Sequence, residues 1–214
     1  MIDRLFTDMP ARIERLPRDA RGFPIPKFVH TRDGLPDFRL VKPGWVSDCY
    51  RRKLCWLCGD TMGRHKSFVI GPMCCINRVS SEPPSHYTCA RFAAKNCPFL
   101  TQPMAKRNER DLPKDRHVAG QMIDRNPGVC AIWTTDSYHR MDVHNGVLFQ
   151  IGDPTEVEFY AKARRATREE VDVSIATGFP LLEKAAELDG SAGLKELNKM
   201  RRDFEKILDA KVPA

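Results

Sequence analysis

The stretch Cys55-Trp56-Leu57-Cys58-Gly59, followed downstream by His86-Tyr87-Thr88-Cys89, decides the expected fold of this chain. Each stretch places two soft ligands three positions apart, and zinc takes four sulfur or nitrogen donors in a tetrahedral arrangement. Gly59 permits the positive φ of a tight turn beside the first pair. The second pair is expected in the first turn of a helix, where the preceding Pro residues are tolerated. The pattern predicts a treble-clef-like zinc module with the ligands Cys55, Cys58, His86 and Cys89.

The fourth ligand and the metal both have alternatives. If His86 lies at the surface, Cys74 or Cys75 becomes the fourth ligand. An iron–sulfur cluster is the rival to zinc, because such clusters take four thiolates at variable spacing. Cys97 follows Cys89 by eight residues on the expected helix. That spacing separates their backbones by about 12 Å, so Cys97 is predicted to be a buried, non-ligating residue.

Positive charge is concentrated around the cysteines. The chain carries +7, and residues 42–116 alone contain 14 Lys and Arg against 6 Asp and Glu, a net +8. Excess positive charge on a compact module favours a polyanionic partner, most commonly nucleic acid. A solvated surface that serves solubility is the alternative interpretation. The residues expected to contact nucleic acid are Arg51, Arg52, Lys53, Arg64, Lys66, Arg78, Arg91 and Lys95.

The chain carries no sign of export or membrane insertion. No stretch reaches the roughly 20 apolar residues of a membrane span, and residues 1–6 lack the apolar core of a signal peptide. We therefore expect a cytoplasmic protein. In that compartment its eight cysteines are expected to bind metal or to stay reduced.

Composition divides the chain into four segments. Residues 1–45 are rich in Pro, Arg and Asp and predict an extended N-terminal arm, and residues 46–100 contain the zinc-binding module. Residues 101–116 are rich in Pro and charge and predict a linker. Residues 117–214 are expected to contain a β-meander and C-terminal helices, which makes the whole chain α+β. One integrated unit is the alternative to separate domains.

The expected meander consists of three short strands. They cover residues 129–133, 138–143 and 147–151. The last two are joined through Asn145-Gly146, which is a strong hairpin signal because both residues tolerate positive φ.

The C-terminal helices carry clear start and stop signals. Thr167 and Glu170 predict a capping box, and Gly178 with Pro180 predicts the end of that helix. A second helix is expected from Pro180 to Leu188, closed by Gly190. In the last helix, apolar residues recur every three or four positions. This apolar stripe is expected to pack on its own domain, with a dimer seam as the alternative.

Two further functions compete with nucleic-acid binding. A hairpin and helix around zinc is also the scaffold of metal-dependent His-Me finger nucleases, for which His65 is the candidate base and Asn77 its orienting residue. Against this function, the region lacks an Asp-His pair entering the hairpin and a second histidine that is not needed to bind zinc. The third class is an interaction module that inhibits or adapts a host or bacterial protein complex. Oligomeric state, substrate and the choice of DNA or RNA do not follow from the residues.

Several motifs together resemble a family of uncharacterised bacterial and phage-encoded proteins. They are the CWxCG turn at 55–59, Phe68-Val69-Ile70-Gly71-Pro72-Met73-Cys74, the run from Ser81 to Ala90 and Cys97-Pro98-Phe99-Leu100. The residues Ala166-Thr167-Arg168 and Gly178-Phe179-Pro180 fit the same family. The resemblance implies one integrated unit in a bacterial or phage setting, and it implies no catalytic residue.

Overall fold

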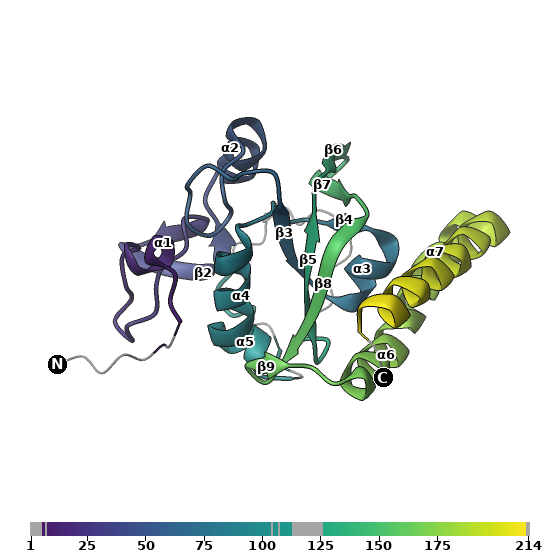
Figure 1. The fold of residues 1–214 in the computed structure, drawn as a ribbon. Coiled ribbons are helices and arrows are strands. Elements are labelled where there is room, and N and C mark those ends of the chain that lie inside the picture. Colours follow the sequence, from purple (N-terminus) through teal and green to yellow (C-terminus); the bar gives the residue numbers. More distant parts are fainter. Residues whose placement is uncertain (1–5, 7, 104, 107, 113–125, 213–214) are drawn as a thin grey trace.

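The computed structural model describes residue 6 and residues 8–103, 105–106, 108–112 and 126–212 (Figure 1). The predicted linker 101–116 and the start of the last segment fall partly outside these residues. The described helices are α1 (Ala11–Glu14), α2 (Trp45–Arg52), α3 (Pro72–Asn77), α4 (Tyr87–Asn96), α5 (Pro98–Thr101), α6 (Arg168–Ala186) and α7 (Gly190–Lys211), with the short helix η1 (Glu187–Asp189) before the last. The described strands are β1 (Val29–Arg32), β2 (Leu35–Val41), β3 (Lys66–Ile70), β4 (Val79–Ser80), β5 (Cys130–Thr135), β6 (Tyr138–Val143), β7 (Gly146–Ile151), β8 (Pro154–Ala161) and β9 (Arg164–Arg165). Helices mixed with antiparallel sheets confirm the α+β class.

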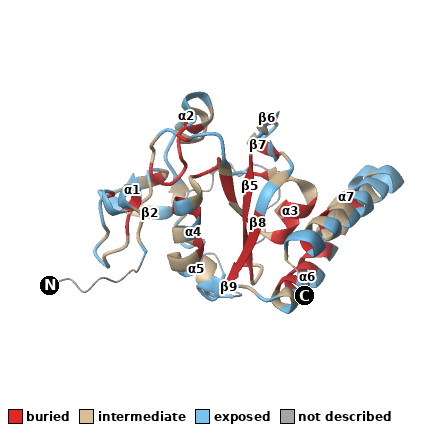
Figure 2. Cartoon of the chain, viewed as in Figure 1, coloured by how far each residue is buried: buried red, intermediate tan, exposed pale blue. Residues whose placement is uncertain are grey.

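The central sheet has the strand order β3-β5-β8-β9, and all its pairs are antiparallel. Figure 1 shows α4 on one side of this sheet and α3, α6 and α7 on the other. Side chains alternate between the two faces of a strand. Accordingly Ile132 packs with Ala90 and Ala94 of α4, whereas Trp133 packs with the other three helices. The buried strands in Figure 2 therefore lie between two helical layers.

The predicted meander is wrong in one respect. Strands β6 and β7 do form the expected hairpin, with Val143 paired to Gly146. However, β5 pairs with β3 and β8, while β6 and β7 form a separate sheet with β4. Every residue of β5 is buried, which is typical of a central strand covered on both faces. Its apolar side chains therefore select distant strands as neighbours instead of the more polar β6.

The first 45 residues contain more structure than an extended arm. They form α1, the antiparallel hairpin β1-β2 and the start of α2. Ile13 and Leu16 are buried against the cysteine-bearing segment. We call this second cluster the metal-module core, and its buried residues are Ile13, Leu16, Cys49, Leu54, Cys55, Trp56, Leu57, Cys58, Met62 and Cys89.

Helix α6 does not stop at Gly178 and Pro180 as predicted, because both residues lie inside it. A Cβ at position 178 would lie 3.1 Å from the side chain of Met73 in α3. Gly178 therefore permits close packing of two helices. Pro180 removes one backbone donor from an exposed turn, and the packed face offsets that loss. Gly190, with a φ of +69°, closes the short helix η1 as its C-cap and is also the first residue of α7. The buried stripe of α7 packs on its own domain.

The capping box at the start of α6 is confirmed and supports a prediction. The Glu170 amide donates to the Thr167 hydroxyl at 3.2 Å, and the Thr167 amide donates to the Glu170 carboxylate at 3.0 Å. We expect Thr167→Ala to lower the free energy of unfolding by about 1 kcal/mol, because an amide loses its partner. Urea denaturation measures this loss. Asn198→Ala, at an exposed position inside α7, is the control and should change stability less.

The carboxylate of the box adds a pH dependence. The Arg164 side chain and the Thr167 amide lower the pKa of Glu170 from 4.5 to about 2. A lowered folded-state pKa stabilises the protein above the unfolded value and ceases to do so as the pH falls toward 2. The stability difference between wild type and Glu170→Gln should therefore shrink between about pH 5 and pH 2. A difference that is constant over this range would contradict the assignment.

Candidate metal centre

The side chains of four residues converge between two elements that are distant in the sequence. Their ligand atoms all lie within 4.8 Å of one another, and they belong to Cys55, Cys58, His86 and Cys89. The two halves of the cluster come from a turn after α2 and from the start of α4. The three cysteines are buried and the histidine is partly buried. A Cys3His group that could hold a metal ion is thus present.

The first pair lies on a tight turn closed by backbone pairing. Leu54 and Thr61 form an antiparallel bridge around the turn, and the Gly59 amide donates to the Cys55 carbonyl at 3.0 Å. Gly59 has a φ of +80°, so glycine is required here as predicted. The turn points both sulfurs toward the start of α4.

The second pair differs from the prediction in its position on the helix. Helix α4 begins at Tyr87, so His86 is its N-cap and lies just before the first turn. The two Pro residues at 83 and 84 are buried in the preceding segment. Ser85 exchanges two backbone hydrogen bonds with Ser67 at the edge of β3. This pairing fixes the direction in which α4 leaves the sheet.

Distances within the cluster fit a tetrahedral ion. The Nδ1 atom of His86 lies 3.4 Å from the Cys58 sulfur and 4.0 Å from the Cys89 sulfur. Zinc bonds of about 2.3 Å to sulfur and about 2.0 Å to nitrogen give neighbouring donors a separation of about 3.5 Å. The observed spacing therefore leaves room for one ion at the centre.

Hydrogen bonds outside the cluster orient its members. The other ring nitrogen of His86, Nε2, lies 3.2 Å from the Thr61 carbonyl. A proton on Nε2 can be donated to that carbonyl, which leaves Nδ1 unprotonated and able to bind a metal. The amides of Cys58 and His86 donate to the Cys55 sulfur at 3.5 and 3.4 Å. These donors stabilise negative charge on that sulfur.

The thiols compete for protons when no cation is bound. The Cys58 and Cys89 thiols donate to Cys55 and lower its pKa well below the ordinary value. The same contacts with Cys55 raise the pKa of Cys58 to about 11 and raise that of Cys89 further. Three thiolates this close repel one another strongly. A divalent cation is the natural way to hold all three deprotonated.

The alternate ligands lie elsewhere. Cys74 and Cys75 belong to α3, which packs beside α6 and α7, and neither belongs to the cluster. Burial raises the pKa of Cys74 to about 11. Cys97 is the C-cap of α4 and lies outside the cluster as predicted, but it is only partly buried. Desolvation nevertheless raises its pKa. All eight cysteines are free of disulfides.

The predicted nucleic-acid contacts separate into two groups. Arg51, Arg52 and Lys53 at the end of α2 and Arg91 on α4 form the first group, and all four are exposed. Within this group, Arg51 also pairs with Asp48 of the same helix at 3.0 Å. The second group has partners in or near the central sheet and the N-terminal segment. Arg64 pairs with Asp136 at 2.7 Å, and Lys95 pairs with Asp8 at 3.7 Å. The Lys66 ammonium donates to a backbone carbonyl, that of Arg64.

Arg78 packs against other side chains of the protein and is mostly shielded from solvent. Its guanidinium lies 4.4 Å from the centre of the Trp133 ring and 3.2 Å from Asp153. Its side chain is only 20% exposed. This arginine is therefore less accessible to a phosphate than Arg51 or Arg52.

The two catalytic candidates, His65 and Asn77, make different kinds of contact. His65 lies just before β3, and its Nδ1 is 2.9 Å from an Asp136 oxygen. Asn77 ends α3, and its side-chain oxygen accepts from the Val79 amide at 3.1 Å. The asparagine thus closes a local turn. Sequence reasoning missed Asp136 as the partner of His65, and only the pairing of β3 with β5 reveals it.

Comparison with known proteins finds no relative. The chain matches no protein-family model, no curated protein and no solved structure. Among the described residues, no helix has the length and apolar character needed to cross a membrane.

Proposed function

We propose that this chain is a zinc-stabilised basic protein that binds nucleic acid or a nucleic-acid-associated complex. The observation that carries the proposal is the Cys3His cluster, with its donor atoms within 4.8 Å and its sulfurs buried. Zinc suits this donor set better than an iron–sulfur cluster, because one of the four ligands is an oriented histidine and the others are thiolates. The ordering of turn, short pairing and helix supports a treble-clef-like module around the ion.

The ion has a structural role in this proposal. Four protein donors complete a tetrahedral shell, whereas catalytic zinc sites keep a position open for water or substrate. The surrounding residues are mainly apolar and belong to the metal-module core. The ion therefore holds the turn, α4 and the N-terminal segment together.

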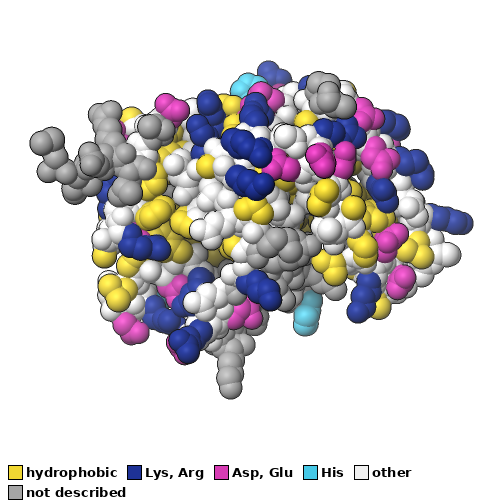
Figure 3. All heavy atoms as spheres, turned by 90° about the horizontal axis from the view of Figure 1, so that it is seen from below, with side chains coloured by type: hydrophobic (Ala, Val, Ile, Leu, Met, Phe, Trp, Pro, Cys, Tyr) yellow, Lys and Arg dark blue, Asp and Glu magenta, His cyan; other side chains and the backbone are white. Residues whose placement is uncertain are grey.

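Basic side chains near this module supply the binding surface. Arg51, Arg52 and Lys53 directly precede the Leu54-Cys55 segment, and all three are exposed. On the face in Figure 3, Lys and Arg side chains are interspersed with Asp and Glu. Positive charge on that face is thus not continuous. A local cluster such as Arg51, Arg52 and Lys53 is therefore the better candidate for phosphate contact.

A charge-removal variant tests the binding. We expect Arg51→Ala/Arg52→Ala/Lys53→Ala to weaken binding of double-stranded DNA or RNA about tenfold or more and to flatten its salt dependence. Each lost phosphate contact should reduce the slope of log affinity against log salt by about 0.9 on B-form DNA. Fluorescence anisotropy between about 50 and 200 mM salt measures both quantities.

A matched variant controls for net charge. Lys184→Ala/Lys195→Ala/Arg202→Ala removes the same charge from exposed positions on α6 and α7 and should change affinity less than twofold. Equal losses in both triple variants would show a non-specific charge effect. Wild-type protein that binds no nucleic acid, or binds with no salt dependence, would contradict the proposal. Capture of a protein complex that survives nuclease treatment would instead favour the interaction module.

One observation favours the nuclease as a second candidate. The Asp136 carboxylate faces Nδ1 of His65, and such a contact orients a histidine so that its other nitrogen can accept a proton. Burial opposes ionisation of Asp136, but Arg64 and His65 outweigh it and lower its pKa. Cleavage of a labelled oligonucleotide by wild type and its loss in His65→Ala would support this function.

A further inference from the structure

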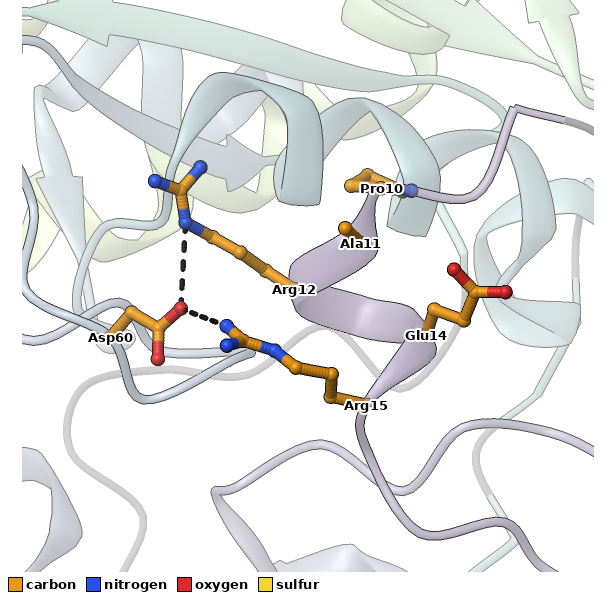
Figure 4. Close-up of a pocket in the computed structure, with 6 residues that line it drawn as sticks. All are labelled: Pro10, Ala11, Arg12, Glu14, Arg15 and Asp60. Atoms are coloured by element: carbon orange, nitrogen blue, oxygen red, sulfur yellow. Dashed lines mark hydrogen bonds and ion pairs between the residues drawn. The ribbon is translucent and has the colours of Figure 1, made fainter.

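An open hollow lies between α1 and the turn that carries the first metal ligands. Its volume is about 570 Å³, and it is lined by Pro10, Ala11, Arg12, Glu14, Arg15 and Asp60. In Figure 4, Arg12 and Arg15 extend from α1 to the same carboxylate, while Glu14 points away from it. The Arg15 guanidinium is 2.7 Å and the Arg12 guanidinium 3.4 Å from one Asp60 oxygen.

The Asp60 carboxylate does not by itself neutralise both arginines. Two guanidinium groups share it, and Glu14, the second acid that lines the hollow, points away from it (Figure 4). The arginine side chains are 48% and 67% exposed. An ion pair this accessible contributes little to stability and is easily exchanged. Arginine binds phosphate through two parallel hydrogen bonds, which makes phosphate a strong competitor for the same donors.

The metal module holds both sides of the hollow in place. Asp60 follows Gly59 in the ligand turn, and its carbonyl accepts from the Cys55 amide at 2.8 Å. On the other side, Ile13 and Leu16 anchor α1 in the metal-module core. The two arginines are therefore presented by a fixed turn of chain instead of a free arm. Their spacing of three residues is the only sequence signal for this site.

We infer that Arg12 and Arg15 form a binding site for a backbone phosphate of nucleic acid, with Asp60 as the counter-ion that the phosphate displaces. The inference rests on the proposed function and extends the binding surface to the N-terminal segment. The hollow is open to solvent and both guanidinium groups are exposed, so a backbone phosphate can reach them.

Opposite effects of two variants test this site. Arg12→Gln/Arg15→Gln should weaken nucleic-acid binding about tenfold and reduce the salt slope by about 1. Asp60→Asn should tighten binding about threefold or more, because the competing carboxylate charge is gone. Lys184→Gln/Lys195→Gln is the matched control and should change affinity less than twofold. Metal content and circular dichroism establish that each variant is folded.

Inorganic pyrophosphate is a second probe that does not depend on nucleic acid. Calorimetry should detect its binding to wild type, with loss in Arg12→Gln/Arg15→Gln. If wild type binds nucleic acid and the double variant binds equally well, the site is wrong and the proposed function stands. If wild type binds pyrophosphate through these arginines but no nucleic acid, the proposed function is wrong and the phosphate chemistry of the site stands. If the double variant loses neither nucleic-acid affinity nor pyrophosphate binding relative to wild type, the site is wrong.

Discussion

Removal of the metal ion is expected to unfold the metal-module core while the central sheet stays folded. The ten buried residues of that core include four cysteines, and three of these belong to the metal-binding group. So small a cluster buries little apolar surface for the chain it orders. A structural zinc ion supplies roughly 10 to 16 kcal/mol of binding free energy at neutral pH, which exceeds what such a cluster supplies by itself.

Hydrogen exchange with and without a chelator tests this expectation by measuring the protection of individual amides. Amides at Leu54, Cys55 and Leu16 should lose protection when the ion is removed, whereas those of β5 should keep it. Purified protein should contain one zinc ion per chain and lack the absorption of an iron–sulfur cluster. Cys58→Ser should abolish metal retention.

The alternate ligands provide the control for this result. Cys74→Ser and Cys75→Ser should retain the ion, since both residues lie on α3 outside the cluster. Loss of metal in either of these variants would contradict the ligand assignment. Protection at Leu54 that is unchanged after complete metal removal would contradict the structural role of the ion.

Trp133→Ala is expected to have the largest effect on the central sheet. The indole is fully buried in the middle of β5. Its Nε1 donates to the Gly152 carbonyl at 3.0 Å, and the Arg78 guanidinium lies over its ring. Truncation leaves a cavity and removes one of the two donors to the Gly152 carbonyl, which also accepts from Arg78 at 3.2 Å. The free energy of unfolding should therefore fall by about 3 to 5 kcal/mol, mainly through the cavity.

Chemical denaturation of the metal-bound protein measures this loss. Trp133→Phe should cost less than Trp133→Ala, because the ring still fills most of the space while the hydrogen bond is lost. Val173→Ala is the control, since Val173 lies on α6 and is 57% exposed. A loss below about 1 kcal/mol in Trp133→Ala would show that this indole is not central to the core.

Local features of the sequence were the ones that could be predicted. The Asn145-Gly146 hairpin and the Thr167-Glu170 capping box depend on residues only a few positions apart. The four predicted metal ligands also lie together, because spacing within each pair reflects a turn and a helix start. Backbone propensities operate over this same range.

Features that depend on distant segments could not be predicted. Strand β5 was assigned to a meander, yet its neighbours are β3 and β8. A stop was expected at Pro180, but helix α6 continues because it packs on α3 and α7. The contact between His65 and Asp136 joins the residue before β3 to the residue after β5, and these two strands pair with each other. Nothing near either residue in the sequence indicates the other.

The sequence by itself determined the donor set of the candidate metal site: two pairs of soft ligands at the spacing of a turn and a helix start, within a strongly basic segment. The tertiary structure decided what surrounds that chemistry. It folds the N-terminal segment onto the module through Ile13 and Leu16, and it brings Arg12 and Arg15 to Asp60. The physical reason is that ligand identity resides in individual side chains, whereas these contacts arise from apolar burial between segments more than 40 residues apart.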